Sequence, residues 1–161
     1  MKRQPITMQM PVNIGKLHFI GIGGIGMSGI AEILFNLGYE ITGSDIKESD
    51  TTKRLENMGI KIFIGQNKSN IASAEAIVIS TAIKEDNPEY ISAQKNDIPI
   101  VHRSEMLAEV MRLRLSIAIA GTHGKTTTTS LVAHALSEAG LNPTIINAVS
   151  YTHLRAHETT L

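Results

Sequence analysis

The stretch SIAIAGTHGKTTTTS, residues 116–130, decides the fold expected for the second half of this chain. It opens with an apolar run at 117–120, which has the length of a buried parallel strand. A loop with glycines at 121 and 124 follows, and a helical pattern then runs over 127–139. A strand, a glycine loop, a Lys-Thr pair and a helix, in that order, predict an α/β unit with a site for a nucleoside triphosphate.

The residue types of this loop suit phosphate chemistry. Glycines let backbone N–H groups converge on phosphate oxygens, and the helix N-terminus adds partial positive charge. Lys125 would reach the terminal phosphates, and the hydroxyl of Thr126 would bind Mg²⁺. The standard pattern has one more glycine, where this chain has Ile119. A plain turn with a solvated lysine therefore stays the alternative.

A second glycine motif lies near the start of the chain. A short β-type run at 16–20 leads into GIGGIG at 21–26, and a helical pattern follows as far as Leu37. The next strand, expected at 40–44, ends at Asp45, where a dinucleotide fold places its ribose-binding acid. The motif predicts a Rossmann-like phosphate turn. The alternative is that the glycines only allow close helix–strand packing and that Asp45 caps a turn.

Short strands and helices alternate through the rest of the first half. Pro99 suggests an edge position for the fifth strand, Pro88 suits the first turn of a helix, and Ser104 is a candidate helix cap. The further strands are expected at 61–64, 76–80 and 98–102, and the helices at 51–58, 88–96 and 104–112. This alternation predicts an open, mostly parallel sheet with helices on both faces.

The two glycine motifs imply two sites in two domains. We expect a leader at 1–15, a Rossmann-like domain at 16–103, a connecting helix at 104–115, the start of an ATP-binding domain at 116–147 and a tail at 148–161. The tail continues neither a strand nor an amphipathic helix, and we expect it to be non-native. His153 and His157 within it could share a metal on a helix, but no third ligand accompanies them.

Composition excludes several classes of protein. Lys and Arg together number 15, as do Asp and Glu, so no net field would attract nucleic acid or an anionic membrane. The chain has no cysteine, which suits a reducing compartment. The first residues lack the continuous apolar core of a signal peptide. These features predict a cytoplasmic protein that binds neither membrane nor nucleic acid.

Several separate segments resemble the Mur ligase family, the ATP-dependent amide-forming enzymes of peptidoglycan precursor synthesis. These segments are GIGGIGMSGIAEIL at 21–34, GYEITGSD at 38–45, STAI at 80–83, DNPE at 86–89, HRSEMLAEVMR at 102–112 and AGTHGKTTTTS at 120–130. The histidine form of the last loop is similar to the branch of the family that joins L-alanine to UDP-N-acetylmuramate. The resemblance spans about 14–147.

The resemblance implies roles for particular residues. Lys125 would stabilise the transferred phosphoryl group, Thr126 would bind Mg²⁺, and His123 would approach the reacting groups or be a plain loop histidine. Arg103 would meet an anionic group or form a surface salt bridge. The implied ATP-binding residues are Gly121, Thr122, His123, Gly124, Lys125, Thr126 and Thr127. The implied UDP-sugar-binding residues are Gly23, Gly24, Ile25, Gly26, Asp45, Ser80 and Thr81.

The family implies a three-domain enzyme that forms an acyl phosphate from ATP and then an amide with L-alanine. Its remaining metal-holding residues and its amino-acid domain come after the point where this chain departs from the pattern, so we expect the chain to be inactive alone. Three alternatives stay open: a murein tripeptide recycling ligase, a non-catalytic nucleotide-binding module and a nicotinamide-dependent oxidoreductase. The last leaves the Lys-Thr loop unexplained.

Overall fold

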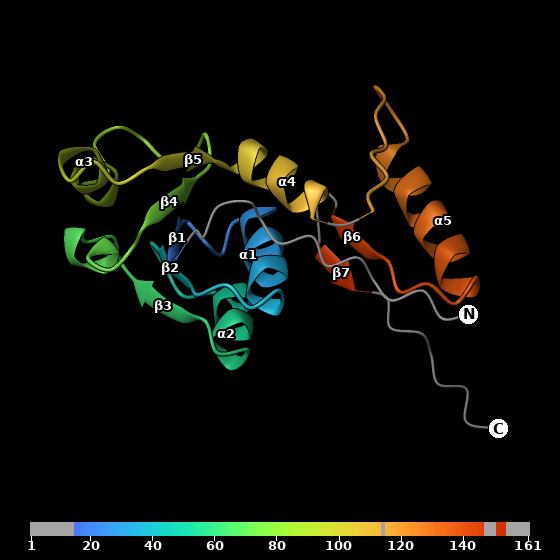
Figure 1. Ribbon diagram of the computed structural model, residues 1–161, viewed down its shortest axis with the longest axis horizontal. Coiled ribbons are helices and arrows are strands. Elements are labelled where there is room, and N and C mark those ends of the chain that lie inside the picture. Colours follow the sequence, from blue (N-terminus) through green and yellow to red (C-terminus); the bar gives the residue numbers. More distant parts are fainter. Residues whose placement is uncertain (1–14, 114, 147–150, 154–161) are drawn as a thin grey trace. The chain divides into compact units, whose positions relative to one another are not determined.

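The computed structural model describes residues 15–113, 115–146 and 151–153 (Figure 1), and the chain divides into two units, with the boundary after Ser116. The first unit alternates strands and helices. Its elements are β1 (Leu17–Ile20), α1 (Met27–Asn36), β2 (Ile41–Asp45), α2 (Asp50–Asn57), β3 (Lys61–Ile64), the 3₁₀ helix η1 (Lys68–Ile71), β4 (Ala76–Ile79), α3 (Pro88–Lys95), β5 (Ile100–His102) and α4 (Arg103–Arg112).

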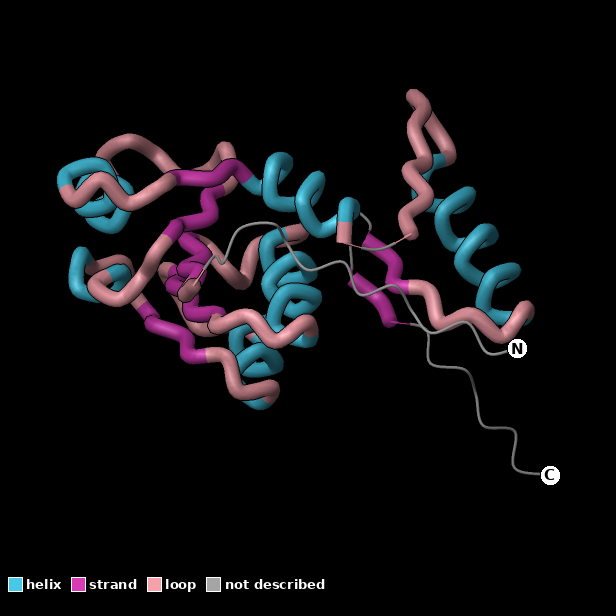
Figure 2. Tube along the Cα trace, in the orientation of Figure 1, coloured by secondary structure: helices cyan, strands magenta, loops and turns pink. Residues whose placement is uncertain are grey.

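The strands of the first unit form one parallel sheet, drawn in magenta in Figure 2, with the order β3-β2-β1-β4-β5. The predicted Rossmann-like architecture is therefore confirmed, and β5 occupies the edge that Pro99 indicated. The chain winds outward in one direction from β1 to β3 and in the other from β4 to β5. Parallel sheets of this kind bind ligands where the winding reverses, here beside the carboxyl ends of β1 and β4.

Apolar layers cover both faces of the sheet. On one face, side chains of β1 and β4 pack against α1, α2 and α4, with Leu17, Phe19 and Val78 fully buried. On the other face, Ile20 of β1 and Ile77 and Ile79 of β4 pack against η1 and α3. Burial of this apolar surface is the main force that holds the helices on the sheet.

The start of α4 differs from the prediction. Ser104 was expected to cap this helix, but the helix begins at Arg103 and its N-cap is His102. The carboxylate of Glu105 accepts a hydrogen bond of 2.9 Å from the backbone N–H of His102. Ser104 lies inside the first turn, so the predicted cap is wrong. The carboxylate of Glu105, three residues after the N-cap, accepts from the N–H of His102.

The segment 104–115 was expected as a connecting helix. In the structure, Met106, Val110 and Leu113 are buried in the apolar cluster that also contains Ile30 and Leu34 of α1. This segment is therefore part of the core of the first unit.

The second unit contains α5 (Lys125–Glu138) and an antiparallel pair, β6 (Thr144–Ile146) and β7 (Tyr151–His153). The strand predicted at 117–120 is wrong: these residues adopt no regular structure, and Ile117 is 63% exposed. No strand among the described residues pairs with this run, and an extended segment without a partner leaves its backbone groups to water.

Residues 151–153 form a strand beside β6, so the expectation that the tail continues no strand is wrong there, while the expectation that the tail is non-native stays a prediction. The expected leader at 1–14, residues 147–150 and the rest of the tail with His157 lie outside the described residues. Among the helices of the described ranges, none is both long and apolar enough to cross a bilayer.

Candidate functional site

The glycine turn at residues 21–26 connects β1 to α1. Gly26 is the N-cap of α1 with φ 82°, a left-handed backbone that favours glycine. The first turn of α1 contains no acidic residue, and no side chain caps it. In the part of the chain that the structure describes, no hydrogen-bond acceptor meets the N–H groups of Ile25 and Gly26. Free N–H groups at a helix N-terminus form a site suited to an anion.

The carboxyl end of β2 holds the first half of this turn. Asp45 accepts a hydrogen bond of 2.9 Å at Oδ2 from the N–H of Gly23. A Cβ added at Gly23 would lie 2.8 Å from the same oxygen and 3.0 Å from Cγ2 of Thr52. Glycine at this position therefore allows close approach to Asp45. The second carboxylate oxygen, Oδ1, meets no hydrogen-bond donor in the described residues.

Arg103 brings a positive charge to the second half of the turn. A Cβ added at Gly26 would lie 2.5 Å from Nη1 of Arg103, and the same nitrogen lies 3.5 Å from the carbonyl oxygen of Ile25. Within the described ranges, Arg103 forms no ion pair with a carboxylate. The surface salt bridge that sequence reasoning kept open is therefore not formed there, and the guanidinium remains available to an anion.

The loop after β4 lies beside the glycine turn. A Cβ added at Gly21 would lie 3.5 Å from Cδ1 of Ile83. Ser80 Oγ accepts a hydrogen bond of 3.4 Å from the N–H of Ala82, and Thr81 is exposed. The structure thus brings the predicted residues of the first site to one edge of the sheet, at the point where the winding reverses.

The second loop leads into α5 with Gly124 as N-cap at φ 75°. Lys125 folds back on this loop: its Nζ donates hydrogen bonds of 2.7 Å to the Gly121 oxygen and 3.2 Å to the Thr122 oxygen. His123 is exposed. The ammonium group of Lys125 therefore lies against the backbone oxygens of this loop.

The threonine run at the start of α5 divides into two groups. The hydroxyl of Thr129 donates to the oxygen of Lys125 at 2.7 Å and so serves the helix. The hydroxyls of Thr126 and Thr127 are exposed and have no hydrogen-bond partner in the described residues. Thr128 is exposed as well, and its hydroxyl has no hydrogen-bond partner in the described residues either. The described residues, this loop included, contain no group of three or more His, Cys, Asp or Glu side chains that could hold a metal ion.

Sequence reasoning missed a buried polar network behind the first site. Glu89, in the first turn of α3, is fully buried and accepts hydrogen bonds of 2.6 Å from both Ser44 Oγ and Asn70 Nδ2. His18 Nε2 lies 3.9 Å from Oε1, the carboxylate oxygen that accepts from Asn70. The DNPE segment was noticed in the sequence, but nothing in its pattern shows that the acid points inward.

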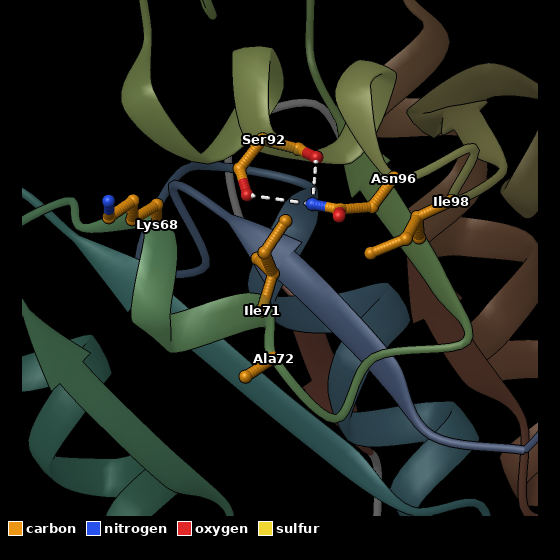
Figure 3. A pocket seen from close by; sticks show the side chains of 6 residues that line it. All are labelled: Lys68, Ile71, Ala72, Ser92, Asn96 and Ile98. Carbon is orange, nitrogen blue, oxygen red and sulfur yellow. Dashed lines mark hydrogen bonds between the residues drawn. The ribbon is translucent and has the colours of Figure 1, made fainter.

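A separate cavity of about 390 Å³ lies between η1 and α3 (Figure 3). Its lining residues are Lys68, Ile71, Ala72, Ser92, Asn96 and Ile98. Asn96 Nδ2 donates hydrogen bonds to the backbone oxygen and to Oγ of Ser92, as the dashed lines show. None of these residues belongs to the glycine turn, to Asp45 or to the loop after β4, so we assign the cavity no role.

Together, the fold and the two loops define an α/β protein with a Rossmann-type glycine turn after β1 and a second glycine loop before α5. Residues 16–115 match the Mur ligase family, catalytic domain. The chain belongs to the Mur ligase family.

The relatives define the branch more closely. The chain is 60% identical over 137 residues to UDP-N-acetylmuramate–L-alanine ligase of Parvibaculum lavamentivorans, covering 85% of this chain and 28% of that protein. It is 59% identical over 140 residues to the ligase of the same name from Brucella ovis, covering 87% of this chain and 30% of the relative. The chain therefore spans less than a third of the length of these relatives.

Two solved structures are similar. UDP-N-acetylmuramate–alanine ligase of Thermotoga maritima has a TM-score of 0.74 at 37% identity, over 81% of this chain and 31% of that one. UDP-N-acetylmuramate:L-alanyl-gamma-D-glutamyl-meso-diaminopimelate ligase of Neisseria meningitides has a TM-score of 0.76 at 30% identity, over 87% and 46%. Both resemble this chain in fold and sequence.

Proposed function

We propose that this chain is part of an ATP-dependent ligase that joins L-alanine to the lactyl carboxylate of UDP-N-acetylmuramate. In this proposal the first unit binds the UDP-sugar and the second unit begins the ATP site. Its support is the family membership together with the names of relatives that share about 60% of the aligned residues.

The observation that carries the proposal is the anion site at the glycine turn. The N–H groups of Ile25 and Gly26, which meet no acceptor in the described residues, would bind the diphosphate together with the guanidinium of Arg103, which has no carboxylate partner there. The free oxygen of Asp45 would accept from a ribose hydroxyl or from the uracil ring. Ser80 and Thr81 lie across the same edge and would contact the rest of the nucleotide-sugar.

The second loop carries an ammonium group, hydroxyl groups and backbone N–H groups, which are suited to ATP and Mg²⁺. Lys125 would exchange the oxygens of Gly121 and Thr122 for the β- and γ-phosphate oxygens, because a phosphate offers it a full negative charge. The exposed hydroxyl of Thr126 would bind Mg²⁺, which supplies charge neutralisation when bound. Gly124 and Thr127 would present backbone N–H groups or the hydroxyl to phosphate. His123 would face the reacting groups.

The reaction would proceed in two steps. The lactyl carboxylate attacks the γ-phosphorus of ATP and releases ADP, and the amine of L-alanine then attacks the acyl phosphate and expels phosphate. Positioning and charge neutralisation at the phosphoryl group lower the barrier.

Binding calorimetry on the full chain tests the proposal. We expect heat of binding with UDP-N-acetylmuramate and with UDP, and none with NADH. The reverse result would replace the ligase with the nicotinamide-dependent oxidoreductase. Binding of UDP-N-acetylmuramate without any binding of ATP would favour a nucleotide-binding module.

The murein tripeptide ligase shares the same sugar nucleotide, so calorimetry of the first unit leaves it open. The 60% identity to an L-alanine ligase favours the L-alanine reaction, against 30% to the tripeptide ligase structure. We place the activity in the cytoplasm, where ATP and nucleotide-sugars are available, with no membrane or nucleic acid as partner.

A further inference from the structure

The interior of the first unit contains an acid that neither loop uses. Glu89 has no exposed surface, although carboxylates are rarely buried without a partner. It accepts hydrogen bonds at both oxygens: Oε2 from Ser44 Oγ at 2.6 Å, and Oε1 from Asn70 Nδ2 at 2.6 Å and the N–H of Asn67 at 3.4 Å. His18 faces the same carboxylate, with 3.9 Å between Nε2 and Oε1.

Ser44 connects this acid to the glycine turn. Its hydroxyl donates to Glu89, while its backbone oxygen accepts hydrogen bonds of 2.8 Å from the N–H of Gly21 and 2.9 Å from the N–H of Ile22. The next residue, Asp45, accepts from the N–H of Gly23. One dipeptide at the end of β2 therefore holds three consecutive N–H groups of the turn, and Glu89 holds the side chain of that dipeptide.

The charge of Glu89 is maintained by its surroundings. Burial raises the pKa of its carboxyl group, but the contacts with His18, Ser44 and Asn70 lower it by more, so that the pKa lies below the ordinary value. A buried ionised group costs free energy that an apolar side chain of the same volume would avoid. Packing alone therefore does not explain a charged residue here, whereas fixing the geometry of its neighbours does.

We propose that Glu89 is a positioning residue of the nucleotide-sugar site, which holds the end of β2 through Ser44 and thereby holds the glycine turn in its binding geometry. This inference rests on the proposed function. Glu89 is buried and contacts the end of β2 through Ser44, so it would change ligand affinity without touching the ligand.

The test compares Glu89→Gln and Ser44→Ala with a matched control in the full chain. Glutamine keeps the volume but replaces one acceptor with a donor, so it cannot accept from both Ser44 and Asn70. Ser44→Ala removes the link and keeps the backbone oxygen that holds the turn. Ile100→Val is the control, because it trims a side chain packed in the apolar cluster under α3 and makes no polar contact.

Two readouts are measured in each variant. One is the dissociation constant for UDP-N-acetylmuramate by calorimetry. The other is the hydrogen-exchange protection of the amides of Gly21, Ile22 and Gly23 by NMR, compared with the global stability from denaturant unfolding. We expect Glu89→Gln and Ser44→Ala each to weaken binding about tenfold and to reduce this protection by a similar factor.

The double variant is expected to lose no more than either single variant, since both remove the same link. Ile100→Val is expected to change neither readout beyond its effect on global stability. Losses that add in the double variant, or a Glu89→Gln protein with wild-type affinity and protection, would overturn the inference. If Glu89→Gln does not fold, Ser44→Ala alone decides the question by the same criteria.

The inference and the proposed function fail in different ways. A wild-type chain that binds UDP-N-acetylmuramate, with variants that bind equally well, refutes the positioning role alone. A wild-type chain that does not bind refutes the proposed function, and amide exchange at Gly21, Ile22 and Gly23 then still decides whether Glu89 holds the turn.

Discussion

Replacing Arg103 with glutamine separates anion binding from stability at the glycine turn. The guanidinium is exposed, has no acidic partner in the described part of the chain, and only approaches the oxygen of Ile25 at 3.5 Å. Its loss should therefore change the free energy of unfolding by no more than about 0.5 kcal/mol. A hydrogen bond from a charged donor to a phosphate is worth about 1.5–3 kcal/mol. Affinity for UDP-N-acetylmuramate should fall roughly 10- to 150-fold.

Arg112→Gln is the matched control. Arg112 lies on the same helix, is exposed, and forms an ion pair of 2.7 Å with Glu109. Both variants lose one positive charge, so a general change in the field of the protein would affect them equally. We expect Arg112→Gln to bind within about twofold of the wild type, because surface ion pairs contribute little.

The assay is titration calorimetry with UDP-N-acetylmuramate at low and at near-physiological salt, accompanied by thermal unfolding of each variant. The loss for Arg103→Gln should persist at the higher salt, because a direct contact is screened less than a distant charge. The reasoning is refuted if Arg103→Gln binds within twofold of the wild type, or if Arg112→Gln loses as much.

Three further predictions follow from the contacts. Gly23→Ala should lower stability by about 1–3 kcal/mol, because the new Cβ would lie 2.8 Å from Asp45 and 3.0 Å from Thr52; an unchanged calorimetric melting temperature would contradict this. Lys125→Met should abolish ATP binding and leave the affinity for UDP-N-acetylmuramate unchanged, both measured by calorimetry, and equal ATP affinity would disprove the role of the lysine. Because the folded pKa of Glu89 lies below 4.5, the stability that its charge contributes is present above pH 4.5 and is lost as the pH falls through the folded value. The stability difference between wild type and Glu89→Gln, followed by denaturant unfolding, should therefore shrink on acidification, and a difference independent of pH would argue against a charged Glu89.

The elements of the first unit were predictable because each carries a local signal. The apolar runs that become β1 and β4 are buried on both faces of the sheet, and Pro88 begins α3 as its position indicated. The helix after the glycine turn, α1, was predictable from apolar residues that recur at helical spacing. The predicted cap at Ser104 failed because serine and glutamate both satisfy helix N-termini, and only the backbone path decides which one does.

The apolar run at 117–120 shows the opposite case. Like the run at 17–20 it is short and largely apolar, yet it forms no strand and leaves Ile117 largely exposed. The run at 17–20 lies between two neighbouring strands, whereas no described strand lies beside 117–120. A strand depends on hydrogen bonds to another segment, so its own residues do not determine it.

The family, the order of the elements in the first unit and the positions of the two glycine loops could be predicted from local patterns in the sequence. Glycine spacing, the Lys-Thr pair and the period of the apolar residues act over a few neighbouring positions, and the chain records such local constraints directly. The tertiary structure was needed to show that Asp45 accepts from the turn, that the guanidinium of Arg103 lies beside the turn, and that the buried Glu89 accepts from Ser44 at the end of β2. These contacts join residues far apart in the chain, and parallel pairing of distant strands, together with burial of the apolar faces, brings them together.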